Sequence, residues 1–368
     1  MTICKIKCVL NKLSKIYKEV KNVREISDQV CRKYHLYGHW KLCWYDKPVI
    51  YKTSSKMARQ YTIVCAQQRK EFAWREKTIQ MCRNVMCCTW RYKMLCENSR
   101  NPVDCIMITR NGNINLFDFS SNTIKKELRY LDIVQAYYLL ENAGYWKYFS
   151  GTVKRISENI IFENYVEFIP QGGWSDEVLI QTFQKISRSY YKYLKNTDMR
   201  YVKISEYLYS LPYANKLLEL LPENCLLWIK ECCPLIGMCV QHGDMGRGNV
   251  LLDKKGEVWV IDFEYAAEYP FFYDLFLFIK LEWERSGSQS LWKEINNMQS
   301  EIGRLFKKIV DCTNYTFSSR ETLFLLLITN LIKASFDLKN DEGIWNEKGV
   351  EKQGKKFACY LRFIEAFS

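Results

Sequence analysis

The stretch from Gln241 to Asn249, Gln-His-Gly-Asp-Met-Gly-Arg-Gly-Asn, decides the fold that we predict for this chain. Asp244 and Asn249 lie five positions apart in it, and both side chains carry oxygen atoms. The apolar run that follows reaches a polar turn at residues 254–257 and returns through a second apolar run to Asp262. Two short apolar runs joined by such a turn are typical of a β-hairpin. We therefore expect Asp262 to return beside Asp244 and Asn249.

These three side chains have the chemistry that nucleotide-dependent phosphoryl transfer requires. The reaction needs a base for the proton of an acceptor hydroxyl, and hard oxygen ligands that hold Mg²⁺ against the nucleotide phosphates. Asp244 suits the first task, while Asn249 and Asp262 suit the second. Each short piece is also common in surface turns and ordinary hairpins, so the prediction rests on the combination.

One known family carries such residues at a similar spacing. The residues in question are His242-Gly243-Asp244, Asn249 and Ile261-Asp262. They resemble the catalytic and metal-binding motifs of the aminoglycoside phosphotransferase and choline kinase-like family, which is related to the protein kinases. The resemblance implies an α+β, bilobal protein-kinase-like fold: a small antiparallel β-sheet N-lobe with one main helix, a larger, mainly α C-lobe, and here a basic N-terminal extension.

The resemblance also implies a role for each residue of the motif. Asp244 would be the catalytic base, and His242 would brace the loop that carries it. Asn249 and Asp262 would be the Mg²⁺ ligands. Asp274 matches the family's later buried aspartate, which supports the loop from below. The cofactors implied are ATP and Mg²⁺.

The expected smaller lobe departs from the family in one respect. Thr123 through Asn142 has the apolar spacing of a helix, and Glu127 near its start resembles the kinase helix glutamate that pairs with a strand lysine. The strand expected before it, Ile114 to Phe119, contains no lysine. Either a neighbouring lysine substitutes, or the strand is misplaced, or nucleotide binding is weakened. The neighbouring candidates are Lys125, Lys126 and Lys154.

The segment Asn159 to Phe168 resembles the last strand of that lobe running into the hinge. Backbone groups of Asn164, Tyr165 and Val166 would then meet the edge of the adenine. A plain strand that ends in a glycine loop is equally consistent with these residues. Beyond it, helical apolar spacing recurs from Ser175 to Lys195 and in later segments, the last at residues 351–367.

Length and composition set the outer bounds. The chain has 368 residues, of which 48% are hydrophobic, which is enough for a large folded core. We predict three segments: a basic extension at 1–87, an N-lobe at 88–168 and a C-lobe at 169–368. No apolar run reaches the length of a transmembrane helix, and no signal-peptide pattern opens the chain. We therefore expect a cytoplasmic protein with reduced thiols at its sixteen cysteines. The oligomeric state stays open.

The positive charge is concentrated at the N-terminus. Residues 1–110 hold 23 Lys and Arg against 8 Asp and Glu, whereas the rest of the chain is nearly balanced. Such a surplus favours an anionic partner, for which an anionic membrane surface or a phosphorylated glycan are the candidates. A solvated helix face without a partner is the alternative. We expect no nucleic-acid partner, since the interleaved aromatic residues more often pack a core.

A metal site at the N-terminus is a further alternative. Cysteine and histidine recur every four residues at Cys31, His35, His39 and Cys43. On one continuous helix the first and last would lie about 18 Å apart, too far to share a zinc ion. Only a bend at Gly38 would make such a site possible.

The sequence thus predicts an ATP- and Mg²⁺-dependent phosphotransferase that acts on a hydroxyl of a small molecule or glycan. By analogy with the family, a sugar or lipopolysaccharide-type acceptor is favoured. Choline or an aminoglycoside is the alternative acceptor, and a nucleotide-binding pseudokinase scaffold is the alternative outside catalysis. Acidic and aromatic residues after the hairpin are candidates for acceptor contact: Glu264, Tyr265, Glu282, Trp283 and Glu284.

Overall fold

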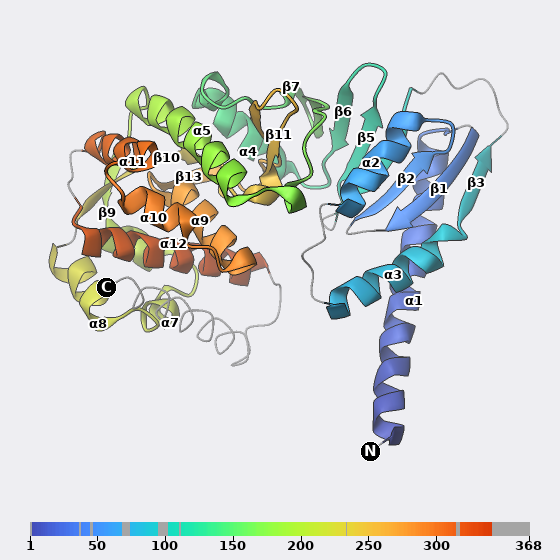
Figure 1. Ribbon diagram of the computed structural model, residues 1–368, viewed down its shortest axis with the longest axis horizontal. Helices are drawn as coiled ribbons and strands as arrows, with labels where there is room; N and C mark the ends of the chain where they lie inside the picture. The colour runs from blue at the N-terminus through green and yellow to red at the C-terminus, as the bar shows by residue number, and fades with distance from the viewer. Residues whose placement is uncertain are drawn as a thin grey trace. The chain divides into compact units, whose positions relative to one another are not determined.

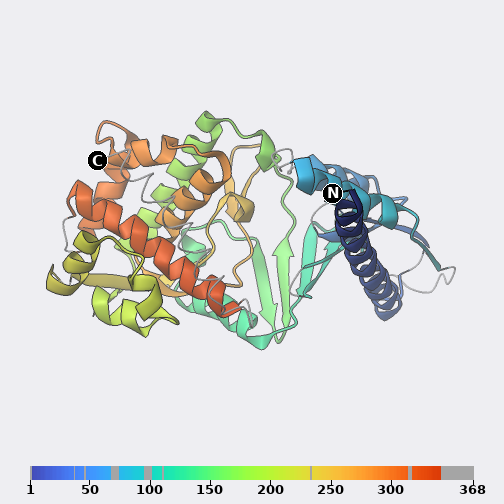
Figure 2. The ribbon, with the colours of Figure 1, turned by 90° about the horizontal axis from the view of Figure 1, so that it is seen from below.

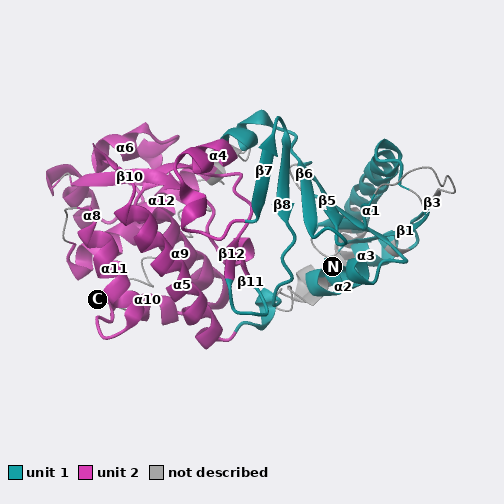
Figure 3. Ribbon diagram, turned by 90° about the horizontal axis from the view of Figure 1, so that it is seen from above, with its two compact units in different colours: residues 1–135, 152–174, 253–257 teal, residues 136–151, 175–252, 258–368 magenta. Residues whose placement is uncertain are grey.

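The structure is a computed structural model, and it describes residues 2–36, 38–44, 47–67, 74–94, 102–109, 112–232, 234–313 and 317–340. The chain forms two compact units (Figure 3). The sheet unit comprises residues 1–135, 152–174 and 253–257, and the helical unit comprises residues 136–151, 175–252 and 258–368. The helix expected at residues 351–367 lies outside the described residues.

One antiparallel sheet organises the sheet unit. Its described strands follow the order β3-β1-β2-β4-β5-β6-β8-β7. They are β1 (Gly38–Trp44), β2 (Pro48–Lys52), β3 (Arg91–Met94), β4 (Cys105–Ile108), β5 (Ile114–Asp118), β6 (Thr123–Glu127), β7 (Val153–Ser157) and β8 (Ile160–Asn164). Residues 1–87 are therefore not a separate appendage, because β1 and β2 belong to the same sheet as β4 to β8.

Helices cover both faces of this sheet. Alternate side chains of the strands, such as Leu42 and Ile106, pack against α1 (Thr2–Lys33) and α3 (Trp74–Cys88). The intervening side chains, such as Phe117, pack on the other face with Tyr61 and its neighbours on α2 (Lys56–Gln67), which lies over the strands in Figure 1. The N-terminal part of α1 projects beyond the sheet, as Figures 1 and 2 both show.

The metal site considered for the N-terminus does not form. Cys31 belongs to the core on the α1 face, whereas Cys43 belongs to the core on the α2 face. Within the described ranges, no cluster of three or more His, Cys, Asp or Glu side chains is placed to hold a metal ion. Both thiols are buried, and burial raises their pKa, so they are inert core residues.

The prediction that a helix begins at Thr123 is wrong. Residues 123–127 form β6, which pairs with β5 on one side and β8 on the other, and helix α4 (Leu131–Asn142) begins only afterwards. Over so few residues, apolar spacing does not distinguish a helix from a strand. Pairing on both sides satisfies the backbone groups of β6, and this decides the outcome.

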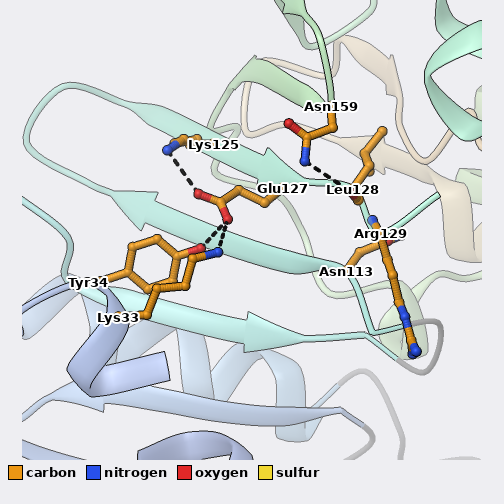
Figure 4. A network of polar contacts seen from close by, with 8 residues as sticks. All are labelled: Lys33, Tyr34, Asn113, Lys125, Glu127, Leu128, Arg129 and Asn159. Atoms are coloured by element: carbon orange, nitrogen blue, oxygen red, sulfur yellow. Dashed lines mark hydrogen bonds and ion pairs between the residues drawn. The ribbon is translucent and has the colours of Figure 1, made fainter. Parts of the chain in front are cut away.

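Glu127 is consequently a strand residue and not the helix glutamate that the resemblance implied. Its carboxylate contacts Lys33 Nζ at 2.7 Å, Lys125 Nζ at 3.0 Å and the hydroxyl of Tyr34 (Figure 4). Burial raises the pKa of Glu127, but these hydrogen bonds outweigh it and lower the pKa overall. The cluster fastens the end of α1 to the sheet.

The helical unit surrounds a small sheet of order β13-β10-β9. Its elements are η1 (Tyr145–Lys147), α5 (Asp176–Lys195), β9 (Arg200–Lys203), α6 (Ile204–Ser210), α7 (Ala214–Leu218), α8 (Glu223–Leu227), η3 (Trp228–Cys232), β10 (Leu235–Gln241), η4 (Arg247–Asn249), β11 (Val250–Leu252), β12 (Val258–Val260), β13 (Ala267–Pro270), α9 (Tyr273–Ser286), α10 (Ser290–Asn296), α11 (Glu301–Asp311) and α12 (Ser319–Asn340). Ser175 caps α5 by accepting the N–H of Val178, as its position before an acidic first turn predicts.

The architecture confirms the predicted fold class, since an antiparallel sheet unit accompanies a mainly helical unit. The predicted hairpin is also confirmed, because β11 and β12 pair in the register Val250↔Val260 and Leu252↔Val258. None of the described helices is both long and apolar enough to cross a membrane.

Candidate active site

The predicted loop follows the central strand of the small sheet, and a buried aspartate holds it. The N–H groups of His242 and Gly243 donate to the two carboxylate oxygens of Asp274 at 2.8 and 3.0 Å. Asp274 is the second residue of α9, so the partial positive charge at this helix end also favours the carboxylate. The supporting role that the resemblance implied for Asp274 therefore has a direct structural basis.

Gln241 is a buried anchor that the sequence analysis missed. Its amide oxygen accepts the N–H of Asp274 at 3.0 Å and the hydroxyl of Tyr190, while its Nε2 donates to the carbonyl oxygen of Tyr269 at 3.1 Å. Every one of these partners is buried. The available signal was a fully polar side chain at the end of the otherwise apolar strand β10.

Gly243 is required by the close approach of two backbone segments. Its φ is +80°, and a Cβ built there would lie 2.1 Å from the carbonyl oxygen of Tyr265. That oxygen also accepts the hydroxyl of Tyr269 at 2.9 Å, which fixes its position. A side chain at this position would push the loop away from its support.

The environment of Asp274 predicts a distinctive pH dependence of stability. Burial raises the pKa of this carboxyl from 3.8 to about 6, although the His242 and Gly243 contacts act in the opposite direction. Between pH 3.8 and about pH 6, Asp274 holds a proton in the folded state that it has released in the unfolded state. The contribution of Asp274 to the free energy of unfolding therefore falls as the pH rises through this range, by about 3 kcal/mol in total.

Urea unfolding of the wild type and of Asp274→Asn between pH 4 and 7 measures this contribution. We expect the difference in the free energy of unfolding between the two proteins to change with pH across this interval, because only the wild type has a carboxyl group at position 274 that titrates. Two curves that stay parallel over the whole range would contradict the assignment.

His242 connects the loop to the hairpin. The backbone N–H of Asp244 donates to His242 Nδ1 at 3.2 Å, and His242 Nε2 lies 2.8 Å from the carbonyl oxygen of Ile261. The ring therefore carries its proton on Nε2 and donates it to Ile261. The fully buried ring of Phe263 packs against the imidazole at 4.9 Å between centroids. His242 thus positions Asp244 and the residue before Asp262, without itself facing solvent.

Asp244 and Asn249 are in direct contact. Asn249 Nδ2 donates to the backbone carbonyl of Asp244 at 2.8 Å and to its Oδ2 at 3.0 Å. The side chain of Asp244 remains 29% exposed, so a substrate can reach it. The amide oxygen of Asn249 takes no part in these two bonds, and it is the atom that suits a hard cation.

Asp262 follows the hairpin residue that bonds to Asn249. The N–H of Ile261 donates to the carbonyl oxygen of Asn249 at 3.0 Å, which places Asp262 directly after a residue bonded to the loop. Asp262 has a φ of +67°, a left-handed conformation that is uncommon outside glycine. Such strain is characteristic of functional positions, and the Asp262 side chain is half-buried.

Two of the residues considered for acceptor contact have other roles. Glu282 is 2% exposed and forms a buried ion pair with Arg247 of η4, while Glu284 pairs with Lys280 at 3.2 Å. Removal of either partner of a buried ion pair leaves an uncompensated charge and destabilises the folded state. Glu282 and Arg247 therefore anchor the segment between Asp244 and Asn249.

The residues predicted to meet adenine lie in the sheet unit. The N–H of Asn164 donates to the backbone carbonyl of Thr152 at 2.6 Å, and the N–H of Tyr165 donates to that of Asn122 at 2.9 Å. Both donors are therefore used within the sheet unit. The ring of Tyr165 packs on Phe119, with centroids 4.7 Å apart. Adenine contact through the carbonyl groups or through Val166 stays a prediction.

A buried lysine that the sequence analysis left open lies on β6. Lys126 Nζ contacts Glu163 Oε1 at 2.9 Å, and the two side chains are 10% and 1% exposed. Thr152 donates to the other oxygen of Glu163 at 3.0 Å. A buried lysine with a carboxylate partner from β8 thus lies one strand after the strand in which a lysine was expected.

Comparisons with known proteins agree with the predicted resemblance. Residues 190–302 match the model of a family described as "Phosphotransferase enzyme family". This range contains His242, Asp244, Asn249, Asp262 and Asp274. A comparison with curated proteins finds no match.

Solved structures similar to this chain include two of choline kinase type and one aminoglycoside phosphotransferase. Choline kinase LicA from Streptococcus pneumoniae is 17% identical, with a TM-score of 0.42 over 69% of this chain and 90% of that one. A choline/ethanolamine kinase family protein from Mesorhizobium loti is 13% identical, with a TM-score of 0.43 over 72% and 90%. Aminoglycoside phosphotransferase APH(3'')-Id from Streptomyces rimosus is 13% identical, with a TM-score of 0.37 over 61% and 91%.

Proposed function

We propose that this chain transfers the terminal phosphoryl group of ATP to a hydroxyl group of a small molecule or glycan. The premise is that the chain is a phosphotransferase, as the family match over residues 190–302 indicates. The observation that carries the proposal is the partly exposed carboxylate of Asp244, held by Asn249 in a loop that Asp274 supports. Each of these contacts lies within the helical unit.

In this proposal Asp244 accepts the proton of the acceptor hydroxyl as the oxygen attacks phosphorus. A carboxylate can do so only when it is ionised, oriented and accessible. Asn249 orients one of its oxygens, and His242 fixes the backbone at the same residue. His242 is therefore a positioning residue in this account.

The residues at the site fit a Mg²⁺ ion. Asn249 and Asp262 offer an amide oxygen and a carboxylate, which are the ligand types that Mg²⁺ takes. Two protein ligands are enough, since this ion usually completes its shell with water and nucleotide phosphates. When bound, the ion would neutralise negative charge on the phosphates.

Lys126 is our candidate for the lysine that contacts the ATP phosphates. Its burial and its pairing with Glu163 support this role, since the carboxylate holds the ammonium group of an otherwise flexible side chain. This role for Lys126 would also answer the main argument for a pseudokinase scaffold. That argument rested on a strand lysine that seemed to be missing.

The acceptor and the surroundings of the protein remain proposals. We favour a sugar or lipopolysaccharide-type acceptor over choline or an aminoglycoside, and a cytoplasmic location. The basic N-terminal segment would face an anionic membrane surface or a phosphorylated glycan.

A screen with ATP labelled at the terminal phosphate tests the proposed function. Choline, aminoglycosides, free sugars and glycolipids are offered in turn with Mg²⁺, and labelled products are separated from ATP. We expect label in a hydroxyl compound of the sugar group, and none when Mg²⁺ is chelated. A protein that binds ATP but transfers label to no acceptor, and releases no phosphate to water, would contradict the proposal.

A further inference from the structure

A lysine from the last described helix contacts Asp244. Lys333 lies on α12, and its Nζ is 3.2 Å from Asp244 Oδ1. Asn249 holds Oδ2, so the two carboxylate oxygens have different partners. The same ammonium group lies 5.5 Å from the centre of the Tyr265 ring. The sequence analysis missed Lys333, because nothing in α12 resembles a catalytic motif.

The backbone around Lys333 is held firmly. Leu331, Ile332 and Ala334 are buried, and Ser335 donates to the carbonyl of Pro212 at 2.8 Å. One turn along the helix, the Phe336 ring packs against Tyr269, with centroids 5.6 Å apart. The lysine side chain itself is only 16% exposed. The packed helix therefore holds the ammonium group of Lys333 beside Asp244.

A fixed ammonium group beside the base has a consequence for the acceptor. The acceptor hydroxyl must approach Asp244 within hydrogen-bonding distance, which brings neighbouring groups of the acceptor close to Lys333. A cationic group there would meet a like charge of low exposure, whereas a neutral or anionic group would not. Lys333 also compensates the charge of Asp244, which leaves no net negative charge from this pair to attract a cation.

We propose that Lys333 is a specificity-determining residue that excludes cationic acceptors and selects uncharged or anionic hydroxyl compounds. The inference rests on the proposed function and refines its acceptor class. It favours sugars, including those that carry a carboxylate or phosphate, over choline and aminoglycosides.

The test compares wild type, Lys333→Gln and Lys333→Glu. ADP release from MgATP is measured with water alone and with glucose, glucuronate, choline or kanamycin added, each scored both as an acceptor and as an inhibitor. For the wild type we expect glucose or glucuronate to serve as an acceptor or an inhibitor, and choline and kanamycin to do neither. For Lys333→Glu we expect the preference for cationic over anionic compounds to rise at least about tenfold.

Two controls separate specificity from folding and from general loss of function. Lys307→Gln removes an equivalent charge on α11, where Lys307 pairs with Asp311 at 3.0 Å on the surface, and should leave the preference unchanged. Lys333→Arg keeps the charge and should keep the wild-type preference. If Lys333→Glu fails to fold, the comparison of Lys333→Arg with Lys333→Gln tests the effect of the charge.

The inference is overturned if wild type uses choline or kanamycin as well as it uses the sugars. It is equally overturned if both Lys333→Gln and Lys333→Glu change the rate of ADP release by the same factor with every compound. The absence of ADP release from wild type under every condition is a different result, because it removes the proposed function itself.

Discussion

Replacement of Asp244 by Asn is expected to reduce phosphoryl transfer by roughly 100- to 10,000-fold, the range that a general base contributes. The amide has nearly the same size as the carboxylate but cannot accept the proton of the acceptor hydroxyl. Because Asp244 is half-buried and its backbone is fixed by His242, the fold should persist. Initial rates of ADP formation at saturating MgATP measure the effect, and thermal unfolding checks the fold.

A matched control comes from α11. Asp311 carries an equivalent carboxylate at the surface, where it pairs with Lys307 at 3.0 Å, so Asp311→Asn should keep the wild-type rate. If Asp244→Asn retained a tenth or more of the wild-type rate while folded, Asp244 would not be the base.

Replacement of Asp262 by Asn is expected to weaken binding of a non-hydrolysable ATP analogue in Mg²⁺ by at least about tenfold, because a charged metal ligand is lost. The substitution suits this position, since asparagine tolerates the left-handed backbone that Asp262 adopts at φ +67°. The backbone strain should therefore be unchanged.

Isothermal titration calorimetry with and without Mg²⁺ measures this second effect. The variant and the wild type should bind the analogue alike when the metal is chelated, since the loss concerns only the metal-dependent part. Equal affinity of the two proteins in Mg²⁺ would exclude Asp262 as a ligand.

The loop and the hairpin could be predicted from sequence because their signals are local. The turn at residues 254–257 and its two apolar flanks favour the pairing of β11 with β12, and Ile261, the residue before Asp262, then bonds to Asn249. Asp274 followed from its spacing in the family motif. The buried Gln241 carried only a weak signal, a polar residue that ends an apolar strand.

The errors arose where partners distant in sequence decide the structure. Thr123 to Glu127 is a strand because β5 and β8 flank it, and no local pattern announces both neighbours. That error left Lys126 as one of three candidate lysines, because its carboxylate partner Glu163 comes from β8. Similarly, the basic first segment joins the sheet through the pairing of β2 with β4, which its composition does not reveal.

Lys333 illustrates the same limit at the site itself. Its approach to Asp244 depends on how α12 packs in the helical unit, through contacts such as that of Phe336 with Tyr269. The motif led us to propose Asp244 as the base, whereas the positive charge beside it comes from a helix beyond residues 190–302.

The central claim is that one oxygen cluster holds a divalent cation through Asn249 and Asp262 while Asp244 acts separately as the base. Electron paramagnetic resonance of Mn²⁺, titrated into the protein with a non-hydrolysable ATP analogue, tests this division most directly. We predict nucleotide-dependent Mn²⁺ binding by wild type and by Asp244→Asn, and its loss in Asp262→Asn. Undiminished Mn²⁺ binding in Asp262→Asn, or no nucleotide-dependent binding by wild type, would contradict the account.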